Sequence, residues 1–89
     1  MAVSFELGRV VATPGALEVL APEEPLVLLR RHASGDWGEV DAHDRRANNR
    51  ALKDGTRILS AYVSAGGERV WIITEADRSS TCLLLPSEY

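Results

Sequence analysis

The chain has 89 residues, of which 45% are hydrophobic and 26% are charged, and its formal net charge is −3. A chain of this length has room for one core, so we expect a single domain over residues 1–89 with a radius of gyration of roughly 12 Å. The composition is typical of soluble globular proteins and argues against a disordered chain. The acidic balance argues against the broad basic field that binds nucleic acids without sequence preference.

Cys82 is the only cysteine, so the chain forms no internal disulfide and no cysteine-based zinc site. It lies in the apolar run "TCLLLP", where we expect a buried structural thiol, and a reducing cytoplasm suits this cysteine usage. The sequence begins without the basic and apolar regions of a secretory signal. No stretch approaches the roughly 18 apolar residues of a membrane span. We therefore expect a cytoplasmic protein with no membrane contact.

A strand and a short helix are predicted first along the chain. "FELGRVVAT", residues 5–13, is rich in residues that favour strands. Thr13 and Pro14 are typical of the N-cap and the first turn of a helix, which we expect to reach about Leu20. Leu17 and Leu20 are expected to share the buried side of this helix.

Two further helices are predicted before the pattern changes. The first begins in "PEEP" and is expected to bury a stripe made of Leu26, Leu29 and Ala33. The second runs from Asp41 or Ala42 to Asp54, with Gly55 after its end. A thin apolar face indicates that this helix either covers the core lightly or exposes a working face. That apolar face consists of Ala47, Ala51 and Leu52.

From Thr56 onward the pattern has a period of two, which is typical of strands. Three strands are expected, with the sequences "RILSAYVS", "RVWIITEA" and "TCLLLP". Gly66 and Gly67 predict a hairpin between the first two strands, and "ADRSS" predicts a reversal before the third. The fold class is therefore α+β: an N-terminal strand, two to three helices, and a three-stranded antiparallel β-meander, packed in two layers. The N-terminal strand is a candidate to join the meander.

No motif for phosphate binding, for a helical zinc site or for a catalytic nucleophile is present in the sequence. His32 and His43 lie eleven residues apart, a spacing that does not place two ligands on one helix face. We therefore predict no metal and no cofactor, and we favour a protein that is not an enzyme.

The third predicted helix carries the first group of candidate binding residues. Arg46, Arg50 and Lys53 recur at four- and three-residue spacing, which aligns them along one side. Arg and Asn side chains clamp phosphates and read base edges, although ordinary solvated helix charge gives the same pattern. Trp37, in the loop sequence "DWG", either binds a ligand or partner or caps a small core. The candidate binding residues are Trp37, Arg45, Arg46, Asn48, Asn49 and Arg50.

A second group of polar residues follows the predicted second strand, in "TEADRSST". An acid, a cation and hydroxyls at one end of a sheet, with a histidine nearby, could act as general acid and base in RNA cleavage. Turns are also enriched in Asp and Ser for backbone reasons alone. The catalytic candidates of this alternative are His32, His43, Glu75, Asp77 and Arg78.

The motifs "HASGDWGEVDAHDRRANN", "GTRILSAY", "GERVWIITEADRSST" and "LLPSEY" resemble a widespread group of small bacterial proteins of unknown function, often carried on plasmids or other mobile elements. The resemblance extends from "LGRVVATPGAL" to Tyr89. It implies a self-contained domain in plasmid or phage biology and assigns no catalytic or binding residue. The order of elements is also similar to that of small ribonuclease toxins of toxin–antitoxin pairs, which are usually basic, whereas this chain is acidic.

These observations favour a non-enzymatic binding or regulatory module that contacts a protein through the Trp37 loop and the polar face of the third helix. Nucleic acid is an alternative partner through the local basic face. An exposed edge strand in "LLLPSEY" could pair with a second copy and give a homodimer. Two other functions stay open, namely a small metal-independent ribonuclease and an inhibitor of a host defence nuclease.

Overall fold

The computed structural model describes residues 5–89, and the fold is α+β, as the sequence predicts. The Cα radius of gyration is 12.0 Å. The helices are α1 (Pro14–Val19), α2 (Glu24–Ala33), α3 (Ala42–Asp54) and the short 3₁₀ helix η1 (Pro86–Glu88). The strands are β1 (Arg9–Ala12), β2 (Ile58–Val63), β3 (Arg69–Thr74) and β4 (Ser80–Leu84).

The four strands form one mixed sheet in the order β1-β4-β3-β2. The strands β2, β3 and β4 are antiparallel neighbours. The predicted three-stranded antiparallel meander is therefore present, but it is not the whole sheet. The N-terminal strand β1, expected as a candidate to join it, adds a fourth strand parallel to β4 and places Val11 opposite Cys82. This pairing also puts β4 inside the sheet, so "LLLPSEY" does not form the expected edge. The two edge strands are β1 and β2.

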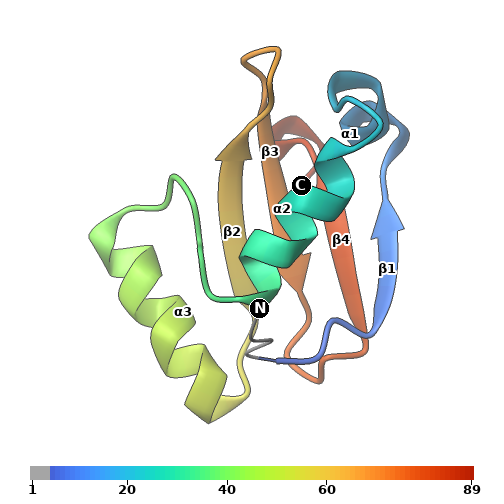
Figure 1. Ribbon diagram of the computed structural model, residues 1–89. Helices are drawn as coiled ribbons and strands as arrows, with labels where there is room; N and C mark the ends of the chain where they lie inside the picture. The colour runs from blue at the N-terminus through green and yellow to red at the C-terminus, as the bar shows by residue number, and fades with distance from the viewer. Residues whose placement is uncertain (1–4) are drawn as a thin grey trace.

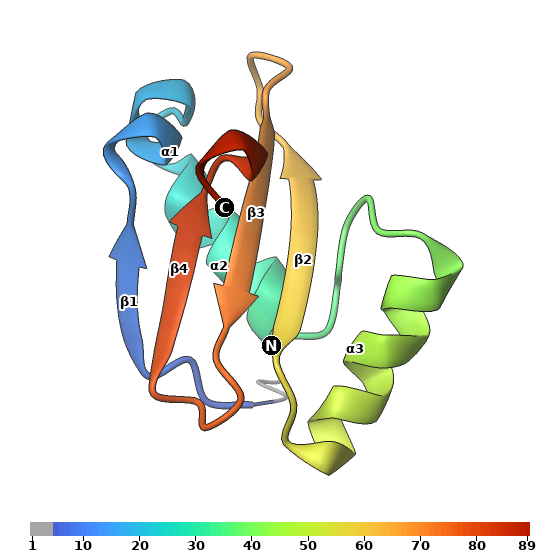
Figure 2. The same ribbon diagram turned by 180° about the vertical axis from the view of Figure 1, so that it is seen from behind.

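The sheet has a different cover on each face. Figure 1 shows α2 lying across one face, while α3 stands beside the β2 edge. Seen from behind, the opposite face of the described chain carries only η1, near the end of β4 (Figure 2). The main core fills the space between α2 and the sheet, and its buried residues are Ala16, Leu20, Leu28, Tyr62, Val70, Ile72 and Leu83.

The ends of α1 and α3 follow the local signals in the sequence. Thr13 caps α1 by accepting a hydrogen bond from the backbone N–H of Ala16 at 3.1 Å. Asp41 caps α3 by accepting one from the backbone N–H of Asp44 at 2.8 Å. Gly55 ends α3 with a φ of 71°, in the left-handed region that glycine adopts without steric cost.

The buried sides predicted for α1 and α2 are wrong in part. Leu20 is buried as expected, but Leu17 is 54% exposed and Leu26 is 56% exposed. In α2 Ala33 is buried as predicted and Leu29 is partly buried against the core, but Leu28 and His32 also face the sheet. The buried side of α2 is therefore wider than the predicted stripe and includes a polar residue, His32, which finds hydrogen-bond partners in the sheet.

Candidate functional site

His32 lies under α2 with its side chain fully buried against the sheet. Its Nδ1 atom is 2.5 Å from Ser60 Oγ in β2, and its Nε2 atom is 2.8 Å from Thr74 Oγ1 in β3. Thr74 Oγ1 lies 2.7 Å from Thr81 Oγ1 in β4. Thr81 donates in turn to the backbone carbonyl of Leu7, just before β1, at 2.7 Å. One continuous line of hydrogen bonds therefore crosses the molecule beneath α2.

The last bond of this line fixes the direction of the two bonds before it, because a hydroxyl has a single proton to donate. Since Thr81 donates to a carbonyl, Thr74 must donate to Thr81. The Nε2–H of His32 must then donate to Thr74. Burial, together with the charge of Arg78, lowers the pKa of His32 to about 4, so the ring is neutral at pH 7. A neutral ring with its proton on Nε2 accepts at Nδ1, so Ser60 donates to it.

The five catalytic candidates do not meet in one cleft. His32 is buried with both ring nitrogens hydrogen-bonded. His43 is exposed in the first turn of α3, whereas Arg78 contacts the end of that helix, roughly 12 Å further along its axis. Glu75 and Asp77 are exposed in the turn between β3 and β4. The structure therefore does not bring these side chains together for proton transfer.

Arg78 joins the β3–β4 turn to the end of α3. Its guanidinium donates to the backbone carbonyls of Thr56 at 2.7 Å and Ala51 at 2.9 Å, and it lies over the ring of Phe5. Its φ of 61° is in the left-handed region, a conformation that no other non-glycine residue of the described chain adopts. The hydrogen bonds offset the cost of that backbone conformation, so the structure gives Arg78 a structural role.

Cys82 is half-buried in β4. Burial raises the pKa of its thiol, and the carboxylates of Glu88 and Glu75 act in the same direction. A raised pKa disfavours the thiolate, which is the form that attacks a substrate or binds a metal. These surroundings give the thiol none of the activation that a nucleophile needs.

Trp37 is 4% exposed, and its indole N–H donates to Asn49 Oδ1 at 3.0 Å. The ring packs against Ile58 in a second, smaller core beside α3. Of the two interpretations of this residue, the structure shows the cap over a small core. The side chain leaves almost no surface for a partner, and the same hydrogen bond occupies the carbonyl of Asn49.

Asn48 is buried on the side of α3 that faces β2. Its Nδ2 donates to the carbonyl of Leu59 at 2.7 Å, and its Oδ1 accepts from the N–H of Leu59 at 3.1 Å. Two residues further along β2, the N–H of Ala61 donates to the carbonyl of Trp37 and its carbonyl accepts from the N–H of Glu39. These contacts cover the edge of β2. Asn48 therefore points toward β2 and away from the solvent. The polar residues around it in the sequence gave no sign of this burial.

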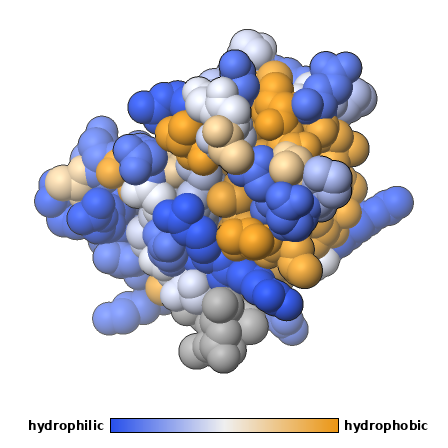
Figure 3. Space-filling view, turned by 45° about the horizontal axis from the view of Figure 1, so that its top comes forward, coloured by the Kyte–Doolittle hydropathy of each residue, from blue (hydrophilic) through white to orange (hydrophobic). Residues whose placement is uncertain are grey.

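The remaining binding candidates lie on the exposed side of α3. Arg45, Arg46 and Arg50 are exposed, and Lys53 extends their row. Within residues 5–89, none of these four cations forms an ion pair. The molecular surface on the α3 side is mostly hydrophilic, whereas apolar surface gathers on the side of α1 and β1 (Figure 3).

A cleft of about 170 Å³ separates α3 from β2. The helix turns Ala47 toward Leu59 of the strand, and the small alanine side chain leaves the space between them open. No single stretch of sequence pointed to this cleft, although the three- and four-residue spacing of its helix residues indicates a common side. The lining residues are Asp44, Ala47, Asn48, Arg57 and Leu59.

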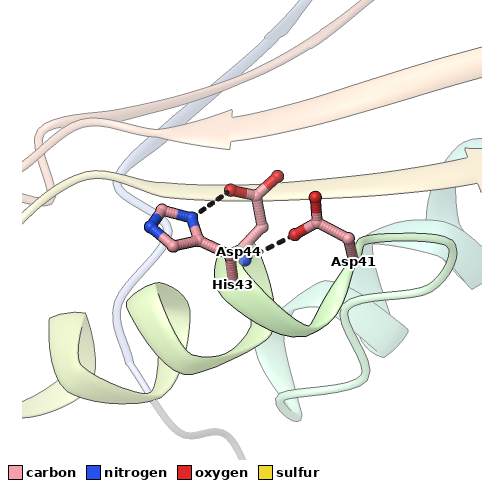
Figure 4. A group of neighbouring side chains, drawn as sticks. All are labelled: Asp41, His43 and Asp44. Carbon is pink, nitrogen blue, oxygen red and sulfur yellow. Dashed lines mark hydrogen bonds and ion pairs between the residues drawn. The ribbon is translucent and has the colours of Figure 1, made fainter.

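Three polar side chains gather at the start of α3, as Figure 4 shows: Asp41, His43 and Asp44. Their candidate ligand atoms all lie within 4.8 Å of one another. Asp41 already caps the helix, and His43 Nδ1 lies 3.5 Å from Asp44 Oδ1. All three side chains are exposed, and helix capping accounts for their arrangement, so we assign no metal to them.

No helix within the described residues combines the length and the apolar character needed to cross a lipid bilayer. Comparison of the chain with protein-family models, with curated proteins and with solved structures finds no match. The function is therefore inferred from the geometry of this chain.

Proposed function

We propose that the protein is a non-enzymatic binding module of a plasmid or phage, and that the exposed side of α3 contacts an acidic segment of a protein partner. The observation that supports this proposal is the row of cations formed by Arg45, Arg46, Arg50 and Lys53, to which the described part of the chain supplies no ion-pair partner. Two arginines four residues apart repel each other and mildly destabilise a helix. A row that does not help the fold is explained by a partner that supplies the missing negative charge.

The charge of the rest of the molecule favours a protein over a nucleic acid. The net charge is −3, and Asp41, Asp44 and Asp54 lie on or beside the same helix as the cations. A nucleic acid presents a long, dense line of phosphates and needs an extended basic surface. A short acidic segment needs only local complementarity, which the row on α3 supplies. The ribonuclease alternative is not proposed, because its catalytic candidates lie apart.

The proposal is tested by reversing charges on α3. A photo-crosslinking amino acid at position 45 should capture a protein in the native host, which mass spectrometry identifies and which is then purified. The double variant Arg46→Glu/Arg50→Glu should bind that protein at least about tenfold more weakly, because two contacts to carboxylates become repulsive. The matched control Arg9→Glu/Arg69→Glu changes the net charge equally at exposed positions on β1 and β3, and should bind normally.

Two outcomes would refute the proposal. Equal binding by both double variants would show that α3 is not the contact surface. Micromolar binding of labelled duplex DNA or RNA by the wild-type protein, lost in Arg46→Glu/Arg50→Glu alone, would identify a nucleic acid as the partner instead.

A further inference from the structure

The cleft between α3 and β2 has the size of one aromatic ring. Its volume is about 170 Å³, close to the roughly 150 Å³ of an enclosed cavity that holds benzene, but the cleft is open to solvent on one side and its lining is both polar and apolar. The half-buried side chains of Ala47 and Leu59 form two apolar walls. A drug-sized ligand needs a larger space, of at least about 300 Å³. The cleft therefore suits a single side chain of a partner.

The polar groups of the cleft select the kind of ring. Asp44 supplies a carboxylate that is half-exposed, and among residues 5–89 its one hydrogen-bonding partner is His43 Nδ1 at 3.5 Å. Arg57 supplies a guanidinium, whose NH1 donates to the hydroxyl of Tyr89 at 2.5 Å while its Cζ lies 5.4 Å from the centre of that ring. Arg57 thus already binds a phenol of this chain through both its ring and its hydroxyl.

We propose that the cleft receives a tyrosine side chain from the acidic segment that α3 binds. The ring lies between Ala47 and Leu59, its hydroxyl donates to the carboxylate of Asp44, and the guanidinium of Arg57, which lines the cleft, stacks on the ring. A phenylalanine would place no donor against Asp44, and the half-exposed carboxylate would be hydrogen-bonded by water alone. The acidic neighbours of the tyrosine would contact the cations of α3 outside the cleft. This inference rests on the proposed function, since that function supplies the partner.

The first test uses p-cresol, the side chain of tyrosine as a free molecule. In amide NMR titrations, p-cresol should shift the signals of Ala47, Asn48 and Leu59 saturably. Its methyl ether, 4-methylanisole, should bind at least fivefold more weakly because it has no proton to donate. Ala47→Leu fills the cleft and should abolish the shifts. The control Ala42→Leu adds the same bulk at an exposed position of α3 outside the lining, and should retain them.

Three results of this first test would overturn the inference. They are a failure of p-cresol to shift these amides, equal shifts in Ala47→Leu, and equal affinity for the methyl ether. Shifts of the same amides that grow with protein concentration in the absence of p-cresol would also overturn it, because a second copy would then occupy the cleft.

The second test separates the tyrosine from the acidic segment. An acetylated acidic peptide with one central tyrosine should bind at least tenfold more tightly than the same peptide with alanine. Arg46→Glu/Arg50→Glu should weaken peptide binding but leave p-cresol binding unchanged. If both peptides bind equally tightly, the tyrosine site is wrong and the proposed function stands. If p-cresol binds and neither peptide does, the cleft binds phenols but the acidic partner is wrong.

Discussion

At His32, two effects on the same side chain oppose each other, and their sizes decide the outcome. His32 lies in the last turn of α2, where the helix macrodipole favours the charged form of a histidine by about 0.3–1 kcal/mol. Burial, with a smaller contribution from the charge of Arg78, works in the opposite direction and lowers the pKa from 6.5 to about 4, which corresponds to roughly 3 kcal/mol. Phe5 and Trp37 pack edge-on against the ring, with centroids 5.2 Å and 5.9 Å away. Burial therefore wins, and the histidine is neutral.

We expect the free energy of unfolding to fall as the pH decreases from about 6.5 to about 4. In this window the unfolded chain binds a proton at His32 that the folded protein does not bind, so the stabilisation is complete above pH 6.5 and roughly 3 kcal/mol is lost by pH 4. Urea denaturation at a series of pH values measures this slope. His32→Gln should remove this part of the slope. His43→Gln changes an exposed histidine and should keep it, and identical slopes in all three proteins would contradict a neutral buried His32.

At the scale of the elements, α3 is attached to the fold mainly by polar contacts. Only Asn48 and Ala51 of its thirteen residues are buried. In the middle of the helix, the side chain of Asn48 pairs with the backbone of Leu59 in β2. Near the end of the helix, Arg78 donates to the carbonyl of Ala51. A helix held in this way depends on a few hydrogen bonds and can be loosened by a single substitution.

Asn48→Ala should lower the free energy of unfolding by about 1–3 kcal/mol, because the backbone N–H and carbonyl of Leu59 lose their partners at a partly buried edge. Hydrogen exchange should accelerate more in the amides of α3 than in those of β3. Denaturation and exchange measured together check both statements. Arg45→Ala, an exposed change on the same helix, should alter neither. Unchanged exchange in α3 of the Asn48 variant would show that other contacts hold the helix.

The parts of the fold that local chemistry determines could be predicted from the sequence. Asp41 and Gly55 fixed the ends of α3, and the alternation after Thr56 located β2, β3 and β4. The N-terminal strand was a candidate to join the sheet, but its neighbour β4 and its parallel direction could not be predicted, because the pairing joins segments about 70 residues apart and no local signal specifies it. The burial of Leu28 in place of Leu26 depends on what lies beneath α2, which the helix alone does not reveal.

The candidate site was predictable to a similar extent. The exposed cations of α3 followed from helical spacing. Trp37 and Asn48 are buried because each finds a partner on another element, Trp37 on α3 and Asn48 on β2. The cleft combines Asp44 and Ala47 of α3 with Leu59 of β2 and with Arg57, which precedes that strand. Its existence therefore depends on how the helix and the strand lie against each other.

At the scale of the whole molecule, the two edges of the sheet differ. The outer backbone groups of β2 are covered by Asn48 and by the segment that starts at Trp37. At the other edge, the N–H of Arg9 donates to the carbonyl of Ser79, and the N–H of Thr13, just after β1, donates to the carbonyl of Leu83. These N–H groups therefore face β4. The alternation of a strand then turns the backbone groups of Val10 outward, where residues 5–89 supply no partner.

Amide exchange should therefore be fast at Val10 and slow at Ala61. The N–H of Ala61 donates to the carbonyl of Trp37 at 3.1 Å, whereas that of Val10 faces solvent. We expect a difference on the order of a hundredfold or more in exchange rate, measured by NMR in deuterated buffer. Equal protection of the two amides would contradict an open β1 edge, and protection at Val10 that rises with protein concentration would show that a second copy covers it.

The one-way line of hydrogen bonds beneath α2 limits how this core can change by mutation. Replacing Thr74 by valine would leave the Nε2–H of His32 without an acceptor and would remove the donor to Thr81, so both neighbours would be affected at once. Each orphaned group costs about 1–3 kcal/mol, a large share of the 5–15 kcal/mol typical of a folded domain. Substitutions along this line are therefore strongly epistatic. A drift toward an apolar core would have to change several of these positions together, and single steps would be selected against.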